Sequence, residues 1–125
     1  MTKVLILGLV LLFLLVILSI IPRRKLLGFQ NPGGEVIICK ASWCGHCKSA
    51  MPEFQKLVSA SPIKLKDGSE ITVRMLDSDA DSQAIQQLNI RGFPTILYKS
   101  SPNASHEEYS GPRTYDGVIG FLNSM

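Results

Sequence analysis

Hydrophobic residues are distributed along the chain in two different ways. Residues 4–21 form a continuous segment of eighteen residues without a charge, in which only Gly8 and Ser19 are not bulky and apolar. A helix of this length rises about 27 Å, close to the thickness of the hydrocarbon core of a bilayer. The rest of the chain has short apolar runs separated by polar and Gly/Pro-rich segments, which is typical of a folded domain.

A cleavable signal peptide is the alternative interpretation of residues 4–21. Its apolar region is usually shorter, and small residues precede the cleavage site. Here the apolar segment ends in Ser19-Ile20-Ile21-Pro22-Arg23, and Ile21 is a poor residue after which to cleave. The pattern therefore favours an uncleaved transmembrane anchor over residues 4–21.

The pattern after the anchor predicts a linker and then an α/β domain. Residues 22–34 combine a basic cluster with the helix-breaking run Asn31-Pro32-Gly33-Gly34, so we expect a linker there. Residues 35–125 alternate between strand and helix patterns, with strands predicted at 36–39, 71–76, 95–98 and 107–110. The predicted helices contain residues 51–58, 84–88 and 115–123, and the polar residues 61–69 predict a loop. The order βαβαββα implies a mixed sheet with helices on both faces.

The distribution of charge excludes one class of partner. The chain has 13 basic and 10 acidic residues, a net charge of +3. Four basic residues flank the apolar segment, namely Lys3, Arg23, Arg24 and Lys25. Nine basic residues then face ten acidic ones, so residues 26–125 carry a charge of about −1. Since the predicted domain has no basic stripe, we expect no nucleic-acid partner.

Two of the three cysteines lie in the motif Trp43-Cys44-Gly45-His46-Cys47, between the first predicted strand and the first helix of the domain. Unpaired amide groups and the dipole at a helix N-terminus favour a thiolate. Cys44 is therefore predicted to be the exposed nucleophile, and Cys47 the more buried resolving thiol. The ring of His46, cationic when protonated, is expected to stabilise the thiolate further. The motif predicts thiol–disulfide exchange.

Other uses of the cysteine pair fit the sequence less well. A zinc site requires about four ligands, and beyond the pair the chain offers only Cys39, His46 and His106. Covalent haem attachment requires a histidine directly after the second cysteine, where this chain has Lys48. A purely structural disulfide would close too short a loop to add much stability. We expect no metal and no bound cofactor, and we expect Cys39 to be an inert core thiol.

These features together resemble the catalytic domains of the protein disulfide isomerases, within the thioredoxin superfamily. The resemblance covers about residues 35–124 and includes the Gly-His pair between the cysteines. Pro52 falls where that family kinks its active-site helix, and residues 89–95 (Asn-Ile-Arg-Gly-Phe-Pro-Thr) resemble its cis-proline loop. Residues 109–113 (Tyr-Ser-Gly-Pro-Arg) resemble the stretch whose arginine tunes the resolving cysteine. The resemblance implies a thioredoxin-like fold and oxidoreductase or isomerase activity on protein cysteines.

The resemblance also implies roles for individual residues. Those with catalytic roles are Cys44, Cys47, His46 and Arg113, and those expected at the substrate are Trp43, Gly45, Phe93 and Pro94. It further implies a cis peptide bond between Phe93 and Pro94. Because proline has no N–H to donate to the sheet, the backbone of Phe93 would be free to pair with an extended substrate.

Two departures from the family pattern affect these expectations. The family usually buries an acidic residue before the motif, where it assists proton transfer at the resolving cysteine, with a lysine partner on the next strand. Those positions are Ile38 and Met75 here, so deprotonation of Cys47 is expected to depend on water, Arg113 or another carboxylate. The short linker also leaves little room for the strand and helix that open a full thioredoxin fold, which favours a minimal version.

The sequence contains conflicting signals about the side of the membrane. Counted literally, Arg23, Arg24 and Lys25 against Lys3 and the α-amine place the domain in the cytosol by one charge. The Gly-His motif instead suits an oxidising compartment, and Asn103-Ala104-Ser105 is an N-glycosylation acceptor usable only on the lumenal side. We favour a lumenal or extracytoplasmic domain that exchanges disulfides with protein substrates and an upstream redox partner. A cytosol-facing reductase and a non-catalytic membrane adaptor are the alternatives.

Overall fold

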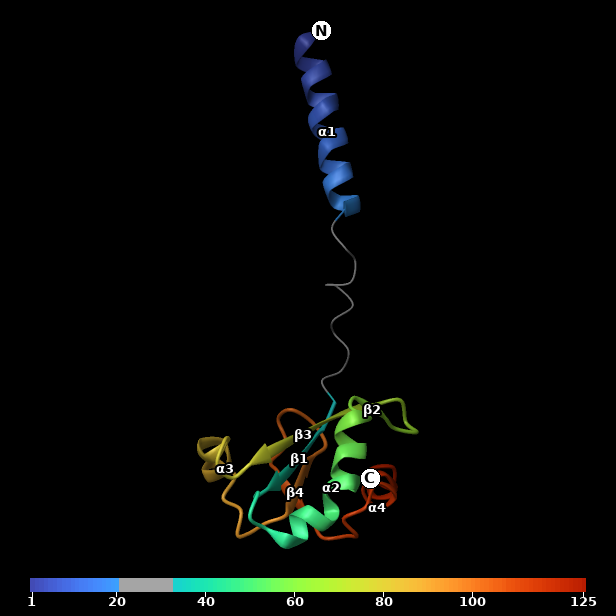
Figure 1. Cartoon of the computed structure of the whole chain (residues 1–125). Helices are drawn as coiled ribbons and strands as arrows, with labels where there is room; N and C mark the ends of the chain where they lie inside the picture. Colours follow the sequence, from blue (N-terminus) through green and yellow to red (C-terminus); the bar gives the residue numbers. More distant parts are fainter. Residues whose placement is uncertain (21–32) are drawn as a thin grey trace. The chain divides into compact units, whose positions relative to one another are not determined.

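The computed structural model describes residues 1–20 and 33–125 (Figure 1). The N-terminal helix and the domain that begins at residue 33 are separate units and are described separately. Most of the predicted linker at residues 22–34, including its basic cluster, lies outside the described residues, as does Ile21 at the end of the predicted anchor.

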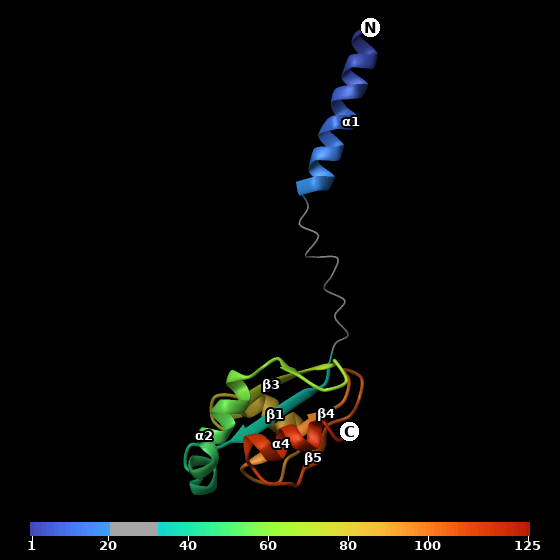
Figure 2. The same ribbon diagram turned by 90° about the vertical axis from the view of Figure 1, so that its right-hand side faces the viewer.

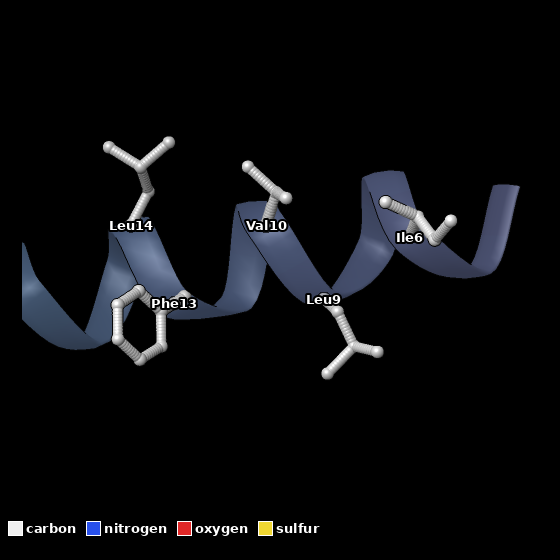
Figure 3. A pocket seen from close by; sticks show the side chains of 5 residues that line it. All are labelled: Ile6, Leu9, Val10, Phe13 and Leu14. Atoms are coloured by element: carbon white, nitrogen blue, oxygen red, sulfur yellow. The ribbon is translucent and has the colours of Figure 1, made fainter. Parts of the chain in front are cut away.

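The N-terminal segment is the helix α1 (Thr2–Ile20), as its apolar pattern predicts. None of its residues is buried. Figure 3 shows apolar side chains projecting from its successive turns, at Ile6, Leu9, Val10, Phe13 and Leu14. The helix is long and apolar enough to cross a membrane, and its length, composition and position fit both an anchor and a signal sequence.

The domain is built on a five-stranded mixed sheet with the strand order β2-β3-β1-β4-β5 (Figure 1). The strands are β1 (Glu35–Lys40), β2 (Ile63–Lys64), β3 (Glu70–Asp77), β4 (Thr95–Lys99) and β5 (Glu107–Tyr109). The helices are α2 (Gly45–Ser59), α3 (Ser82–Gln87) and α4 (Tyr115–Leu122). β1 runs parallel to β3 and antiparallel to β4, while the edge strands β2 and β5 pair antiparallel with their neighbours.

One strand lies where the sequence predicts a loop. Within residues 61–69, Ile63 and Lys64 form β2 and pair with Ile71 and Glu70. Ile63 is buried, and Gly68 takes a positive φ of 87° where the chain reverses direction. A strand of two residues is too short to show an alternation of apolar and polar positions, so the loop prediction was wrong at this point.

The central strand β1 is buried on both faces. Val36 and Ile38 belong to a core cluster on the side of α2 and α4, whereas Ile37 and Cys39 pack on the opposite side with residues of α3. This explains why the sequence of β1 is a continuous apolar run. Figure 2 shows α2 and α4 on the same side of the sheet. The prediction of helices on both faces is confirmed, and β1 is the first strand of the described domain.

We expect Phe54→Ala to lower the free energy of unfolding by about 3–5 kcal/mol. Phe54, on α2, is fully buried in the cluster between that helix and the sheet, so its truncation leaves a cavity. Urea unfolding of the full chain in detergent, followed by the fluorescence of Trp43, measures the change. The exposed Glu108→Ala is the control and should change stability by less than about 0.5 kcal/mol. Equal stability of the two variants would contradict the packing described for α2.

Candidate active site

The predicted cysteine pair lies at the N-terminus of α2, directly after β1. Cys44 is the N-cap residue, with an extended backbone (φ −85°, ψ 118°). Its Sγ accepts a hydrogen bond of 3.4 Å from the backbone N–H of Cys47, so sulfur occupies the position usually held by a Ser, Thr or Asp oxygen. A negative charge on this sulfur would also be favoured by the helix dipole. The local structure is therefore suited to a thiolate at Cys44.

The surroundings shift the two thiols in opposite directions. The pKa of Cys44 is lowered, first by a hydrogen bond with the Cys47 side chain and then by backbone N–H groups and the charge of Arg113. The pKa of Cys47 is raised, mainly because burial removes the thiol from water. The backbone of Ala41 and the charge of Lys40 oppose this increase. The pair therefore consists of one activated thiol and one that is held protonated.

Cys44 is less exposed than the sequence predicted. Its relative exposure is 7%, against 0% for Cys47, so the expected order holds but the description of Cys44 as an exposed nucleophile was wrong. The two sulfur-bearing residues form a small cluster with Ala41, and Phe93 packs against this cluster. A loop distant in sequence thus covers the thiol, which local sequence cannot reveal.

Phe93 and Pro94 precede β4, and the peptide bond between them is cis, as the resemblance implied. The Cys44 thiol donates a hydrogen bond of 3.5 Å to the carbonyl oxygen of Phe93. That carbonyl, expected to be available to a substrate, is therefore occupied while Cys44 is protonated. A thiolate has no proton to donate, so ionisation of Cys44 would release the carbonyl. Pro94 is itself buried.

The other predicted substrate residues form an open rim beside Cys44. Trp43 is 69% exposed and makes an edge-to-face contact with the ring of Phe93, with centroids 5.9 Å apart. Gly45 is the first residue of α2, and a β-carbon there would meet nothing within 4 Å. Both residues are exposed to solvent beside the cysteine pair.

His46 and Arg113 affect the pKa values of the cysteine pair in ways that differ from those expected. The ring of His46 is exposed, and this residue lowers the pKa of Cys44 through its backbone N–H. Arg113 lies in the loop before α4, and its charge acts on Cys44, whereas the resemblance implied an effect on the resolving cysteine. The cation that acts on Cys47 is instead Lys40, at the end of β1.

Two apolar residues stand where protein disulfide isomerases usually have a buried acidic residue and its lysine partner, as the sequence indicated. Ile38 on β1 is paired in register with Met75 on β3, and Ile38 is fully buried. Two residues further along the same strands, Lys40 is in register with Asp77 and forms a salt bridge with it. Sequence reasoning missed this pair, although a lysine at the end of an otherwise apolar strand was a visible signal.

The remaining cysteine and histidine lie apart from the site. Cys39 is fully buried on the α3 side of the sheet, and burial raises its pKa to about 11, as expected for an inert core thiol. His106 lies 3.7 Å from a carboxylate oxygen of Glu35. Among residues 1–20 and 33–125, no three His, Cys, Asp or Glu side chains are grouped so that they could hold a metal ion.

We expect Cys44 to be alkylated by iodoacetamide at lower pH than an ordinary cysteine. Since the pKa of Cys44 is lowered, its thiolate is already present at a pH where an ordinary thiol is protonated. The rate should rise as the pH passes through this pKa and level off above it. Mass spectrometry of the full chain at successive pH values measures the rate for Cys44 and Cys47 separately. A midpoint for Cys44 at or above that of Cys47 would contradict the described geometry.

A helix-capping cysteine pair in contact with a cis-proline loop, on a mixed sheet of this topology, defines a thioredoxin-type domain. The family model for thioredoxin matches residues 30–124, and the chain belongs to this family. The prediction of a thioredoxin-like fold is thereby confirmed.

The chain is also related to protein disulfide-isomerases. It is 39% identical over 84 residues to the protein disulfide-isomerase of Oryctolagus cuniculus, and 36% identical over 83 residues to that of Gallus gallus. Each alignment covers 66% of this chain but only 16% of the relative, so the chain spans a small part of these proteins. The first thioredoxin domain of mouse protein disulfide-isomerase A4 superimposes with a TM-score of 0.58 at 24% identity, over 80% of this chain and 66% of that one.

Proposed function

We propose that this protein is a thiol–disulfide oxidoreductase or isomerase that acts on the cysteines of protein substrates through a redox-active Cys44–Cys47 disulfide. The observation that carries this proposal is the asymmetry of the pair. Cys44 caps α2 and has a lowered pKa, whereas Cys47 is fully buried and has a raised one. Cys44 is therefore suited to attack a substrate disulfide, and Cys47 is suited to resolve the mixed disulfide that forms.

The chemistry proceeds in two exchanges. The Cys44 thiolate attacks one sulfur of a substrate disulfide, and the other substrate sulfur leaves as a thiolate that takes up a proton. The Cys47 thiolate then attacks Cys44 Sγ, the bond from Cys44 to the substrate breaks, and the second substrate sulfur leaves. The substrate gains two electrons, and the protein retains the Cys44–Cys47 disulfide. The reverse sequence oxidises a substrate dithiol, and escape before the second exchange permits isomerisation.

Substrate contact in this proposal involves the rim of the site. The exposed ring of Trp43, the open surface at Gly45 and the Phe93 carbonyl surround the cysteine pair. An extended polypeptide fits these features, because the carbonyl can accept a backbone hydrogen bond once Cys44 has ionised.

The proposal is tested with the full chain in detergent and two protein substrates. The protein should accelerate the reduction of insulin by dithiothreitol, and it should accelerate the reactivation of ribonuclease that contains scrambled disulfides. Acceleration of reduction alone would favour a reductase over an isomerase. If both reactions proceed at the uncatalysed rate, the proposed activity is wrong, and a non-catalytic adaptor becomes the better account.

We further propose that α1 anchors the chain and that the domain lies on the lumenal or extracytoplasmic side, where an upstream redox partner recharges it. The relationship to protein disulfide-isomerases favours the secretory pathway. Asn103 lies exposed in the turn between β4 and β5, where a glycosyltransferase could reach it.

Labelling of Cys44 with a membrane-impermeant thiol reagent tests this topology in sealed microsomes, whose outer face is the cytosolic one, after the cysteine pair has been reduced with membrane-permeant dithiothreitol. A lumenal domain should be protected until the membrane is permeabilised. Labelling of intact membranes would instead support the cytosol-facing reductase that the flanking charges favour.

A further inference from the structure

A salt bridge lies at the end of β1, just before the segment that leads to the cysteine pair. Nζ of Lys40 is 2.5 Å from Oδ2 of Asp77, the residue beside it in the parallel register of β1 and β3. Both side chains are about one-fifth exposed, at 21% and 22%. Solvent therefore screens this pair less than a pair on the open surface.

Asp77 is fixed by hydrogen bonds as well as by the lysine. Its Oδ1 accepts from the backbone N–H of Asp79 at 2.9 Å and from that of Ala80 at 3.4 Å. Its own backbone N–H donates to Oδ2 of Asp81. Lys40 and these amides hold the pKa of Asp77 at about 2. The carboxylate therefore stays ionised at neutral pH, where it can hold Lys40 in place but cannot accept a proton from a thiol.

The backbone around Lys40 connects this salt bridge to the resolving cysteine. The carbonyl of Lys40 accepts a hydrogen bond of 2.9 Å from the N–H of Ser78, which fixes the end of β1 against the chain after β3. The next residue, Ala41, packs in the cluster of the two active-site cysteines, and its backbone lowers the pKa of Cys47. Side chains alternate along β1, so Lys40 projects from the same face as Val36 and Ile38, the face that α2 covers, and its positive charge lowers the pKa of Cys47.

The charged and titratable groups around Cys47 divide into two sets. Cys44 disfavours a second thiolate beside it, whereas Lys40 favours the Cys47 thiolate. The positive charge of Arg113 and the backbone of His46 act on Cys44 instead. Asp77 is the salt-bridge partner of Lys40, and its negative charge is not among the causes that shift the pKa of Cys47. Lys40 is therefore the cation in the described structure that favours ionisation of the resolving thiol.

We propose that Lys40, held by Asp77, is a positioning residue for the resolving step, stabilising the Cys47 thiolate that attacks the mixed disulfide. The inference rests on the proposed function and refines it. It accounts for how the site works with Ile38 and Met75 in place of the family's charged pair. Lys40 would act differently from the family's buried carboxylate. An ammonium group cannot accept the proton of the Cys47 thiol, but its positive charge stabilises the thiolate that remains.

The resolving step requires only the mixed disulfide, the Cys47 thiol and water. The Cys47 proton passes to water, and the thiolate attacks Cys44 Sγ. The bond between Cys44 and the substrate sulfur breaks, and that sulfur leaves with the electron pair and takes a proton from water. Resolution should therefore become faster as the pH rises towards the pKa of Cys47 and level off above it.

Quenched-flow kinetics on the full chain in detergent can separate attack from resolution. The reduced protein is mixed with a peptide disulfide, quenched with acid and alkylated, so that mass spectrometry counts the mixed disulfide as it forms and decays. Below the pKa of Cys47, Lys40→Met should slow the decay by about fivefold, as expected for the loss of one partly screened charge. The midpoint of the pH profile should move upwards, while the rate of formation by Cys44 stays unchanged.

Two further variants make the result specific to the charge at this place. Lys40→Arg keeps a cation beside Asp77 and should restore most of the wild-type pH profile. Lys48→Met removes an exposed lysine directly after Cys47 and should leave the profile unchanged. An unaltered decay in Lys40→Met, with wild-type activity intact, would overturn this inference and leave the proposed function standing. A wild-type protein that forms no mixed disulfide at all would overturn the proposed function itself.

Discussion

The Cys44→Ala variant is expected to reduce insulin no faster than the uncatalysed reaction. Cys44 is the thiol that caps α2, has the lowered pKa and is more accessible than Cys47. Without it, Cys47 is the remaining thiol at the site, fully buried and with a raised pKa. Since exchange begins with a thiolate that can reach the substrate, neither reduction nor isomerisation should proceed.

The matched control is Cys39→Ala. Cys39 is fully buried on the α3 side of the sheet, so its removal deletes a thiol without touching the pair. This variant should keep wild-type turnover and lose only a modest part of its stability. Substantial exchange by Cys44→Ala, or loss of exchange in Cys39→Ala with the fold intact, would show that the nucleophile has been assigned wrongly.

The Cys47→Ala variant is expected to accumulate mixed disulfides with its substrates. Attack by Cys44 is retained, but no second thiol remains three residues later to break the bond between Cys44 and the substrate. Turnover should fall close to background, and non-reducing electrophoresis of the full chain with a substrate protein should show new covalent complexes. Dithiothreitol should release them.

The pH of this experiment matters. The Cys47 side chain is the first cause of the lowered pKa of Cys44, so Cys47→Ala should raise that pKa. Trapping should therefore be slow at neutral pH and faster at alkaline pH, where Cys44 is ionised without help. The Cys44→Ala/Cys47→Ala double variant should form no complexes. Complexes that persist in the double variant would mean that Cys39 or non-covalent binding is responsible.

The sequence predicted the features of this domain that depend on short stretches of chain. The continuous apolar run of β1 indicated a strand buried on both faces, and the spacing of Cys44 and Cys47 indicated a pair at a helix N-terminus. β2 could not be predicted, because its two residues are a strand only through their pairing with β3. The bounds of the anchor and linker stay predictions, since residues 21–32 lie outside the described structure.

The electrostatics of the site could not be predicted from sequence for a different reason. The low exposure of Cys44 depends on Phe93, which comes from a loop 49 residues further along the chain. The effect of Arg113 on Cys44 depends on how the loop before α4 lies relative to the N-terminus of α2. The effect of Lys40 on Cys47 depends on the course of the β1–α2 segment and on the salt bridge between Lys40 and Asp77 of β3. The sequence shows which residues are charged, but the packing of these segments determines which thiol each charge affects.

A redox titration of the full chain in glutathione buffers would show whether Cys44 and Cys47 act as one redox couple. Alkylation and mass spectrometry at each potential would report the state of every cysteine. We expect a single two-electron transition in which Cys44 and Cys47 become protected together as an internal disulfide, while Cys39 stays a thiol throughout. Separate glutathione adducts on Cys44 and Cys47, with no internal disulfide at any potential, would contradict it.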